Sequence, residues 1–296
     1  MTIQIERTIR EAYVQASSFL AQAGVPDHAF TAELLLRHLL KWTRSEWFMR
    51  WDEPFPVESA AQWDALLARR AAGEPVQYII EEQEFYGLPF TVTSAVLIPR
   101  PETELLVEEA IRLGRKLWDE QEKLPTVADI GTGTGAIAVS LAAQCPGWSL
   151  IAVDISEQAL QIAKRNAEIN GVSESIQFRA GDLLKPLISD GIAVDMLLSN
   201  PPYIPAEEWQ GLQREVRDYE PITALVGGAD GLDFYRAIIE QLAELPQYPA
   251  IVGFEVGMGQ AGDVAQLLQS RKQWEEIRIV RDLAGIERHV IAVAQG

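Results

Sequence analysis

The sequence predicts an α/β protein in which a doubly wound parallel sheet follows a smaller helical domain. From Val127 onward, short apolar runs typical of strands alternate with helical patterns, as expected for a parallel sheet covered by helices on both faces. The first ~72 residues show only the periodicity of amphipathic helices. An extended segment at residues 84–98 separates these regions. We therefore predict a helical domain at 1–83, a hairpin linker at 84–104 and an α/β domain at 105–296.

The helical domain is predicted from two apolar stripes and from residues that start and stop helices. Asp27 and Ser59 are suited to helix N-caps, and Gly73 to the end of the last helix. The stripes contain Ala12, Ala16, Phe19, Leu20 and Ala23, and Leu35, Leu36, Leu39 and Leu40. We expect the tryptophans to pack mostly in a core, and any exposed subset to be a partner surface. They are Trp42, Trp47, Trp51 and Trp63.

The strands of the α/β domain follow a hairpin predicted around Tyr86-Gly87-Leu88-Pro89. Ligands of such sheets bind beyond the carboxyl ends of the strands, so residues at these ends are the candidate site. The predicted strands are 127–130, 150–154, 176–180, 194–199, 251–256, 277–281 and 290–294.

The net charge weighs against a nucleic-acid substrate. The chain has 43 acidic and 25 basic residues, a formal charge of −18, which opposes unassisted binding to phosphate backbones. A local basic patch that includes Arg100 would still permit it.

Cysteine and histidine usage predicts neither disulfides nor a metal site. Cys145 is the single cysteine, which favours a reducing compartment. His28, His38 and His289 are widely spaced and more typical of surface or core packing than of ligands. With no signal-peptide core and no apolar run near the ~20 residues that span a bilayer, we expect a cytoplasmic protein with no membrane partner.

The tetrapeptide Asn200-Pro201-Pro202-Tyr203 follows the predicted strand 194–199. The amide oxygen of Asn200 and the carbonyl of Pro201 can accept both hydrogens of one NH2 group, and Tyr203 can stack over its plane. The prolines fix their own φ angles and favour an extended Asn200. Alone, the tetrapeptide fits a proline-rich turn equally well, so its context decides.

A glycine loop, residues 131–135, joins the strand at 127–130 to an apolar helix. Glycines allow a tight turn there and a close approach of a ligand to the backbone. The next strand ends in Asp154, 19 residues beyond Gly135 (154 minus 135), where a carboxylate can accept hydrogen bonds from ribose hydroxyls. Alternatively, Asp154 caps the following helix. The G-x-G-x-G spacing disfavours a dinucleotide, for which G-x-G-x-x-G is usual.

Together, the glycine loop, Asp154 and the NPPY tetrapeptide resemble class I methyltransferases that use S-adenosylmethionine and release S-adenosylhomocysteine. This superfamily places an acidic residue, here Asp182, near the adenine amino group, although Gly181-Asp182 is equally typical of a turn. Leu183 would supply an apolar surface for the base. The resemblance also implies a seven-stranded sheet whose last two strands form an antiparallel hairpin.

Further segments resemble one family, the release factor glutamine methyltransferases, from about Ala32 to Val290. Its members methylate the side-chain amide nitrogen of the glutamine in the Gly-Gly-Gln motif of peptide-chain release factors. The resemblance implies this substrate, docked by the helical domain, and some members carry an aromatic residue where this chain has Leu183. The matching segments are 73–79 (GEPVQYI), 85–87 (FYG), 97–104 (LIPRPETE), 231–236 (GLDFYR) and 254–257 (FEVG).

A carboxamide nitrogen is a poor nucleophile because its lone pair is delocalised. By accepting its two N–H groups, Asn200 and Pro201 would aim the nitrogen at the donor methyl and favour the positive charge that develops on it. We expect no general base, because the nitrogen becomes strongly acidic after transfer. The predicted catalytic residues are Asn200, Pro201, Pro202 and Tyr203; the predicted cofactor-binding residues are Gly131, Thr132, Gly133, Thr134, Gly135, Asp154, Asp182, Leu183 and Asn200.

Other interpretations remain open. Glu102, Glu255 and Arg288 can line the site or join the domains, but helix capping and surface ion pairs explain them equally well. The substrate could instead be a glutamine of a ribosomal protein or an exocyclic amine of a nucleic-acid base. A non-catalytic adapter that binds a translation factor is the third alternative.

Overall fold

A computed structural model describes residues 7–118, 124–271 and 274–294. By packing, the chain forms two compact units. The first contains Met1–Glu81 together with Gln213–Tyr219, and the second contains Glu82–Leu212 and Glu220–Gly296. The hairpin region therefore packs with the second unit, and residues 213–219 pack with the first although both of their flanks belong to the second. The predicted functional division at residues 83 and 104 stays a prediction.

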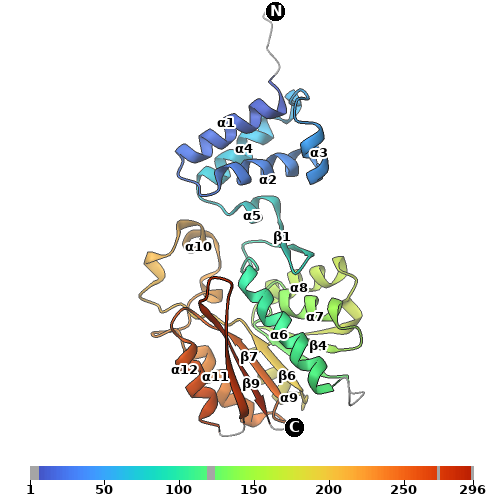
Figure 1. Cartoon of the computed structure of the whole chain (residues 1–296), viewed down its shortest axis with the longest axis vertical. Coiled ribbons are helices and arrows are strands. Elements are labelled where there is room, and N and C mark those ends of the chain that lie inside the picture. Colours follow the sequence, from blue (N-terminus) through green and yellow to red (C-terminus); the bar gives the residue numbers. More distant parts are fainter. Residues whose placement is uncertain (1–6, 119–123, 272–273, 295–296) are drawn as a thin grey trace, which may run out of the picture. The chain divides into compact units, whose positions relative to one another are not determined.

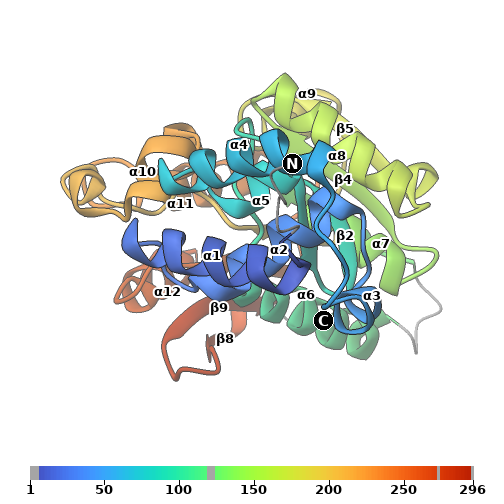
Figure 2. The same cartoon turned by 90° about the horizontal axis from the view of Figure 1, so that it is seen from above.

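The first unit is helical. Thr8 and Thr43 begin two of its helices with capping boxes, in which the hydroxyl accepts from the backbone of Glu11 or Glu46 and the glutamate bonds back. Viewed from two directions, α1 and α2 lie side by side (Figures 1 and 2). The helices are α1 (Ile9–Gln22), α2 (His28–Leu40), α3 (Arg44–Met49), α4 (Ala60–Ala71), α5 (Val76–Ile80) and α10 (Arg214–Tyr219), with a 3-10 turn at Val57–Ser59.

The residues predicted to begin and end helices in this unit lie at helix ends, but not all of them make the expected capping hydrogen bond. Asp27 and Ser59 occupy the N-cap positions of α2 and α4, yet neither side chain makes a capping hydrogen bond. Gly73 follows α4 with a φ of 103°, a backbone conformation that glycine adopts without strain.

The tryptophans build the core of this unit, as predicted. Trp47 and Trp63 are buried, and Trp42 and Trp51 are partly buried. Trp47 and Trp51 meet edge to face with their ring centroids 4.6 Å apart. None of the four is exposed, so no exposed tryptophan marks a partner surface on this unit. Phe48 and Met49 of α3 are exposed apolar side chains beside them.

The second unit opens with the predicted hairpin, β1 (Glu82–Phe85) and β2 (Leu88–Thr91), which pair antiparallel. Tyr86 and Gly87 form its two-residue turn, both with positive φ, which matches the twist of the flanking strands. The hairpin is shorter than the predicted segment, because Val96 N bonds to Thr93 O in a turn and residues 92–100 are irregular.

The large sheet has seven strands in the order β5-β4-β3-β6-β7-β9-β8. Strands β3 to β7 are parallel, and β9 runs antiparallel between β7 and β8. The predicted doubly wound sheet and its antiparallel terminal hairpin are therefore confirmed. The strands are β3 (Thr126–Ile130), β4 (Ser149–Asp154), β5 (Ile176–Ala180), β6 (Met196–Ser199), β7 (Ile251–Glu255), β8 (Trp274–Arg281) and β9 (Glu287–Ala294).

Helices cover both faces of this sheet, with one hydrophobic core on each (Figure 1). Apolar side chains of α6 and α7 fill one core, and those of α11 and α12 fill the other. This two-sided burial explains the uninterrupted apolar runs of the central strands. The helices are α6 (Pro101–Trp118), α7 (Ala136–Gln144), α8 (Glu157–Ile169), α9 (Lys185–Ser189), α11 (Asp233–Gln241) and α12 (Ala261–Gln269).

Candidate active site

A cavity of ≈ 500 Å³ opens at the carboxyl ends of β3, β4, β5 and β6. It is lined by eight of the predicted site residues: Gly131, Gly133, Asp154, Asp182, Leu183, Asn200, Pro201 and Pro202. A smaller pocket of ≈ 50 Å³, which shares Gly131, Gly133 and Asn200 with it, is lined by Thr132, Thr134, Arg100 and Thr103. Gly135 and Tyr203 line neither.

The glycine loop has a backbone that only glycine adopts readily. Gly131, Gly133 and Gly135 all have positive φ angles, between 54° and 80°. A Cβ atom at Gly131 would meet no atom within 4 Å, so the loop backbone at this position is open. At Gly135, a Cβ atom would lie 3.1 Å from the Cβ of Ala163 in α8. Gly135 therefore permits close packing of α7 and α8.

The two threonines of the loop use their polar groups within the fold. The Thr132 hydroxyl donates to Asp129 Oδ2 at 2.6 Å, and the Thr134 carbonyl accepts from Asn166 Nδ2 at 2.9 Å. Asp129 is fully buried, and burial raises the pKa of its carboxyl to about 7. These contacts hold the loop to β3 and α8.

Asp154 connects the end of β4 to the glycine loop. Its Oδ2 accepts from Gly133 N at 2.9 Å, and its Oδ1 accepts from Ser156 N at 2.8 Å. Burial raises its pKa, although these backbone N–H groups oppose the rise. The cap of α8 is instead Ser156, whose hydroxyl accepts from Ala159 N. The structure thus removes the alternative in which Asp154 caps this helix.

The segment after β5 combines a turn with an unusual backbone. Asp182 pairs with Lys185, with 2.6 Å between Oδ2 and Nζ. Leu183 has a φ of 52°, which is uncommon for a residue with a side chain and is found at functional sites more than elsewhere. Ile155 lines the same cavity and is 71% exposed, an apolar surface that the sequence reasoning missed.

Asn200 and Pro201 end β6 at the cavity. Asn200 Nδ2 donates to Thr103 Oγ1 at 3.2 Å. Among the described residues, no group donates to Asn200 Oδ1 or to the Pro201 carbonyl. Two acceptors next to each other in the chain are thus left without a protein partner.

Tyr203 packs behind this segment. Its carbonyl accepts from Gln260 Nε2 at 2.9 Å, and its side chain packs against the core beneath α11 and α12. Burial raises the pKa of its hydroxyl to about 12, so it stays protonated at neutral pH.

A buried polar chain lies beneath Asn200. Thr103 Oγ1 is 2.6 Å from Glu255 Oε2, and His289 Nε2 is 3.8 Å from the same oxygen. Thr103, Glu255 and His289 are respectively 4%, 2% and 0% exposed. Glu255 is therefore neither a helix cap nor a surface ion pair. Arg288 does form the expected ion pair, with Asp282 at 3.2 Å, and Glu102 lies in the first turn of α6.

Arg100 does not form a free basic patch. Its guanidinium is bonded to Glu220, a carboxylate with 5% exposure that also accepts from Ile98 N. Because this charge is paired, it adds little positive potential to the cavity.

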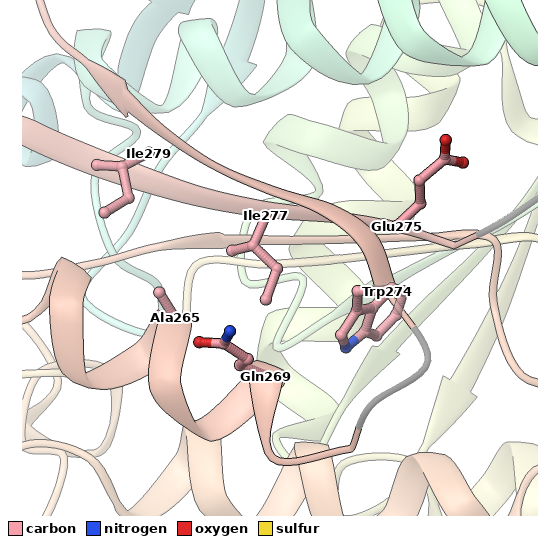
Figure 3. A pocket seen from close by; sticks show the side chains of 6 residues that line it. All are labelled: Ala265, Gln269, Trp274, Glu275, Ile277 and Ile279. Atoms are coloured by element: carbon pink, nitrogen blue, oxygen red, sulfur yellow. The ribbon is translucent and has the colours of Figure 1, made fainter.

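A second cavity, of ≈ 470 Å³, lies between α12 and β8 (Figure 3). Glu275 is the one charged side chain among its lining residues, so it lacks the convergent polar groups typical of an active site. Across the described ranges, no three histidine, cysteine or acidic side chains gather as a metal site, and no helix is long and apolar enough to span a membrane.

Comparison with known proteins identifies both parts of the chain. Residues 11–80 match the model of the PrmC N-terminal domain, and residues 113–213 match that of the methyltransferase small domain. The catalytic domain of human METTL16 in complex with an RNA hairpin has a similar fold, with a TM-score of 0.57 at 19% identity over 78% of this chain and 82% of that one. The N-terminal domain of human METTL16 in complex with SAH has a TM-score of 0.51 at 17% identity, over 95% of each chain.

Relatives of nearly the same length are much more similar in sequence. The release factor glutamine methyltransferase of Bacillus anthracis is 41% identical over 96% of this chain and 98% of its own. That of Bacillus subtilis is 40% identical over 97% and 98%, and that of Chlorobaculum tepidum is 38% identical over 94% of each. This chain belongs to the release factor glutamine methyltransferase family.

Proposed function

We propose that this protein transfers a methyl group from S-adenosylmethionine to the side-chain amide nitrogen of the glutamine in the Gly-Gly-Gln motif of peptide-chain release factors. The observation that carries the proposal is the pair of unpartnered acceptors, Asn200 Oδ1 and Pro201 O, at the same cavity as the glycine loop and Asp154. A primary amide has two N–H donors on one nitrogen, which matches two adjacent acceptors.

The lining of the cavity fits the cofactor. Asp154 retains lone pairs beyond its two backbone bonds and can accept from ribose hydroxyls. Ile155 and Leu183 offer apolar surface to the adenine ring, and Asp182 can accept from its amino group. Open backbone at Gly131 and Gly133 allows the amino-acid end to approach the loop. Thr132, Thr134 and Gly135 would support the loop that binds.

When bound, S-adenosylmethionine supplies an electrophilic methyl group on its sulfonium. Asn200 Oδ1 and Pro201 O would accept the two amide hydrogens of the substrate glutamine and so orient its nitrogen toward that methyl group. As positive charge grows on the nitrogen, its N–H groups become stronger donors, and both bonds strengthen in the transition state. Pro201 and Pro202 restrict the backbone, so the acceptors are positioned before substrate binds.

We assign no general base. Tyr203 remains protonated at neutral pH, since its pKa is about 12, and it cannot accept a proton there. The methylated nitrogen is acidic enough to lose its proton to water after transfer. Because Tyr203 lines neither pocket, it would act from behind: its packing against the core and its carbonyl bond to Gln260 would hold the NPPY segment in place, and the stacking predicted for its ring has no support in the pocket linings.

The test uses purified protein, methyl-labelled S-adenosylmethionine and a purified release factor, with the labelled residue mapped by mass spectrometry. We expect label on the Gly-Gly-Gln glutamine and none on a release factor in which that glutamine is alanine. Parallel reactions contain ribosomal proteins or nucleic acid; label confined to either would overturn the proposal in favour of those substrates.

A variant tests the role of the acceptor. Asn200→Ala is expected to lower single-turnover rates ~100-fold or more, because it removes one transition-state acceptor, while calorimetry shows S-adenosylhomocysteine binding within about threefold of wild type. Wild-type turnover by this variant would refute the acceptor pair but leave the substrate assignment standing.

A further inference from the structure

The orientation of the Asn200 side chain decides whether it can work as an acceptor. An asparagine amide presents oxygen on one side and NH2 on the other, and the two have nearly the same shape. If the amide turned over, an NH2 group would face the substrate NH2, and two donors would repel each other. Something in the fold must therefore determine which end faces the cavity.

The contacts beneath Asn200 determine it. The Thr103 hydroxyl donates its single proton to Glu255 Oε2, at 2.6 Å. Thr103 Oγ1 is then left with lone pairs only, and it can bond to Asn200 solely by accepting from Nδ2, at 3.2 Å. Asn200 Oδ1 consequently points away from Thr103 and stays free to accept.

The fold around Thr103 and Glu255 holds their hydrogen bonds in place. Thr103 lies in the first turn of α6 and Glu255 at the end of β7, and both are almost fully buried, so water does not compete for their hydrogen bonds. His289, opposite Glu255 in the antiparallel pairing of β7 and β9, places an imidazole against the carboxylate.

We propose that Thr103 and Glu255 are positioning residues that fix the direction of hydrogen bonding, so that Asn200 always presents its oxygen to the substrate amide. The proposal rests on the proposed function, since it explains how Asn200 becomes an acceptor. In this arrangement Glu255 acts through Thr103, and Thr103 acts through Asn200.

Removing the Thr103 hydroxyl tests whether Thr103 orients Asn200. Thr103→Val keeps the shape of the side chain but frees the Asn200 amide to turn over, and we expect kcat to fall ~10-fold, the effect of one lost hydrogen bond. Thr103→Ser keeps the hydroxyl and should restore kcat to within about threefold of wild type. Thr91→Val is the matched control, because Thr91 is also buried in this unit but lies outside the cavity; it should leave kcat unchanged.

Reversing the direction of the hydrogen bond between Thr103 and Asn200 tests whether Glu255 orients the Thr103 hydroxyl. In Glu255→Leu, no acceptor remains for the Thr103 proton, which then turns to Asn200 and draws its oxygen away from the cavity. We expect kcat to fall by at least as much as in Thr103→Val, with S-adenosylhomocysteine affinity within about threefold of wild type. This readout separates positioning from damage to the fold, and it remains available if Thr103→Val folds poorly.

The double variant provides the decisive comparison. Because Glu255 acts only through Thr103, Thr103→Val combined with Glu255→Leu should be no slower than Thr103→Val alone. Losses that multiply in the double variant would overturn the proposal, as would wild-type kcat in Thr103→Val or in Glu255→Leu. An active Asn200→Ala enzyme would instead contradict the acceptor pair itself, so the two failures are distinguishable.

Discussion

Asp129 is a carboxylic acid at the centre of the sheet, and its ionisation should lower the stability of the second unit. It lies in β3 with 1% exposure. Its Oδ2 accepts from Thr132 Oγ1 and from Ala138 N, and its Oδ1 is buried without a partner among the described residues. The variant Asp129→Asn keeps an acceptor for both donors and removes the titration.

The size of the effect follows from the pKa. Burial raises the Asp129 pKa from 3.8 to about 7, whereas in the unfolded chain the carboxyl keeps its ordinary value. Below pH 3.8 both states are protonated, so Asp129 contributes no pH dependence. As the pH rises from about 4 to about 7, only the unfolded state loses the proton, and the folded state is progressively destabilised. At 1.36 kcal/mol per pH unit the full loss is roughly 4 kcal/mol, reached above pH 7.

Hydrogen exchange of the β3 and β6 amides, followed by mass spectrometry from pH 4 to pH 8, measures this loss in the unit concerned. We expect the unfolding free energy of Asp129→Asn to rise relative to wild type by several kcal/mol across that range. Comparing the two proteins at each pH cancels the titration of all other groups. A difference that stays constant from pH 4 to pH 8 would refute the reasoning, because it would mean that Asp129 titrates alike in the folded and unfolded states.

Three further outcomes are expected. An ionised carboxylate accepts hydrogen bonds from ribose hydroxyls more strongly than a protonated one, and burial raises the pKa of Asp154, so S-adenosylhomocysteine affinity should fall as the pH is lowered from neutrality. Asp154→Asn should bind more weakly and lose this pH dependence in calorimetry. Gly135→Ala should lower stability by ~2 kcal/mol or more, because of its positive φ and the contact with Ala163. In Gly133→Ala the new Cβ would meet only Gly131 O, at 4.0 Å, so this variant should cost only the ~1–2 kcal/mol of backbone strain; chemical denaturation compares the two variants. Leu183→Gly should relieve ~1 kcal/mol of left-handed backbone strain but lose the packing of Leu183 against the core, so its stability should not exceed that of wild type. Cofactor binding should weaken, and equal affinity would show that the leucine does not contact the base.

The sheet and most of the cavity were predictable because their signals are local. Each strand is a short apolar run, and parallel strands bring their carboxyl ends together, so Gly131, Asp154 and Asn200 could be assigned to one site without any long-range information. The hairpin was predictable for the same reason, from a glycine between two extended segments, although the positive φ of Tyr86 is one that a tyrosine rarely adopts.

The polar chain beneath Asn200 could not be predicted this way. Thr103 is separated from Asn200 by 97 positions and from Glu255 by 152. Both residues lie in segments that resemble the family, but the local sequence does not show that they contact each other or Asn200. The sequence showed no histidine near the NPPY tetrapeptide, but the antiparallel pairing of β9 with β7 brings His289 opposite Glu255. Likewise, only packing reveals that residues 213–219 belong with the helical unit.

The direction of hydrogen bonding also explains why asparagine, and not aspartate, follows β6. A carboxylate at this position would accept from the substrate amide at least as well, so an acceptor alone does not require asparagine. It would have no N–H to donate to Thr103, however, and the single Thr103 proton cannot serve both the new carboxylate and Glu255.

Asn200→Asp separates these two requirements. The new carboxylate would lie near the buried Glu255, and the Thr103 hydroxyl would be the one donor that the two share. Repulsion between them would displace the new carboxylate from its position at the cavity, or raise its pKa so that it is protonated. We expect single-turnover rates reduced ~100-fold or more, comparable to Asn200→Ala, with calorimetry on S-adenosylhomocysteine as the control for an intact cavity. Combining it with Glu255→Gln supplies an uncharged partner that lets the Thr103 proton turn to position 200, and partial recovery of the rate is expected. An aspartate variant as fast as wild type would mean that acceptance alone suffices and that the direction imposed by Thr103 plays no part.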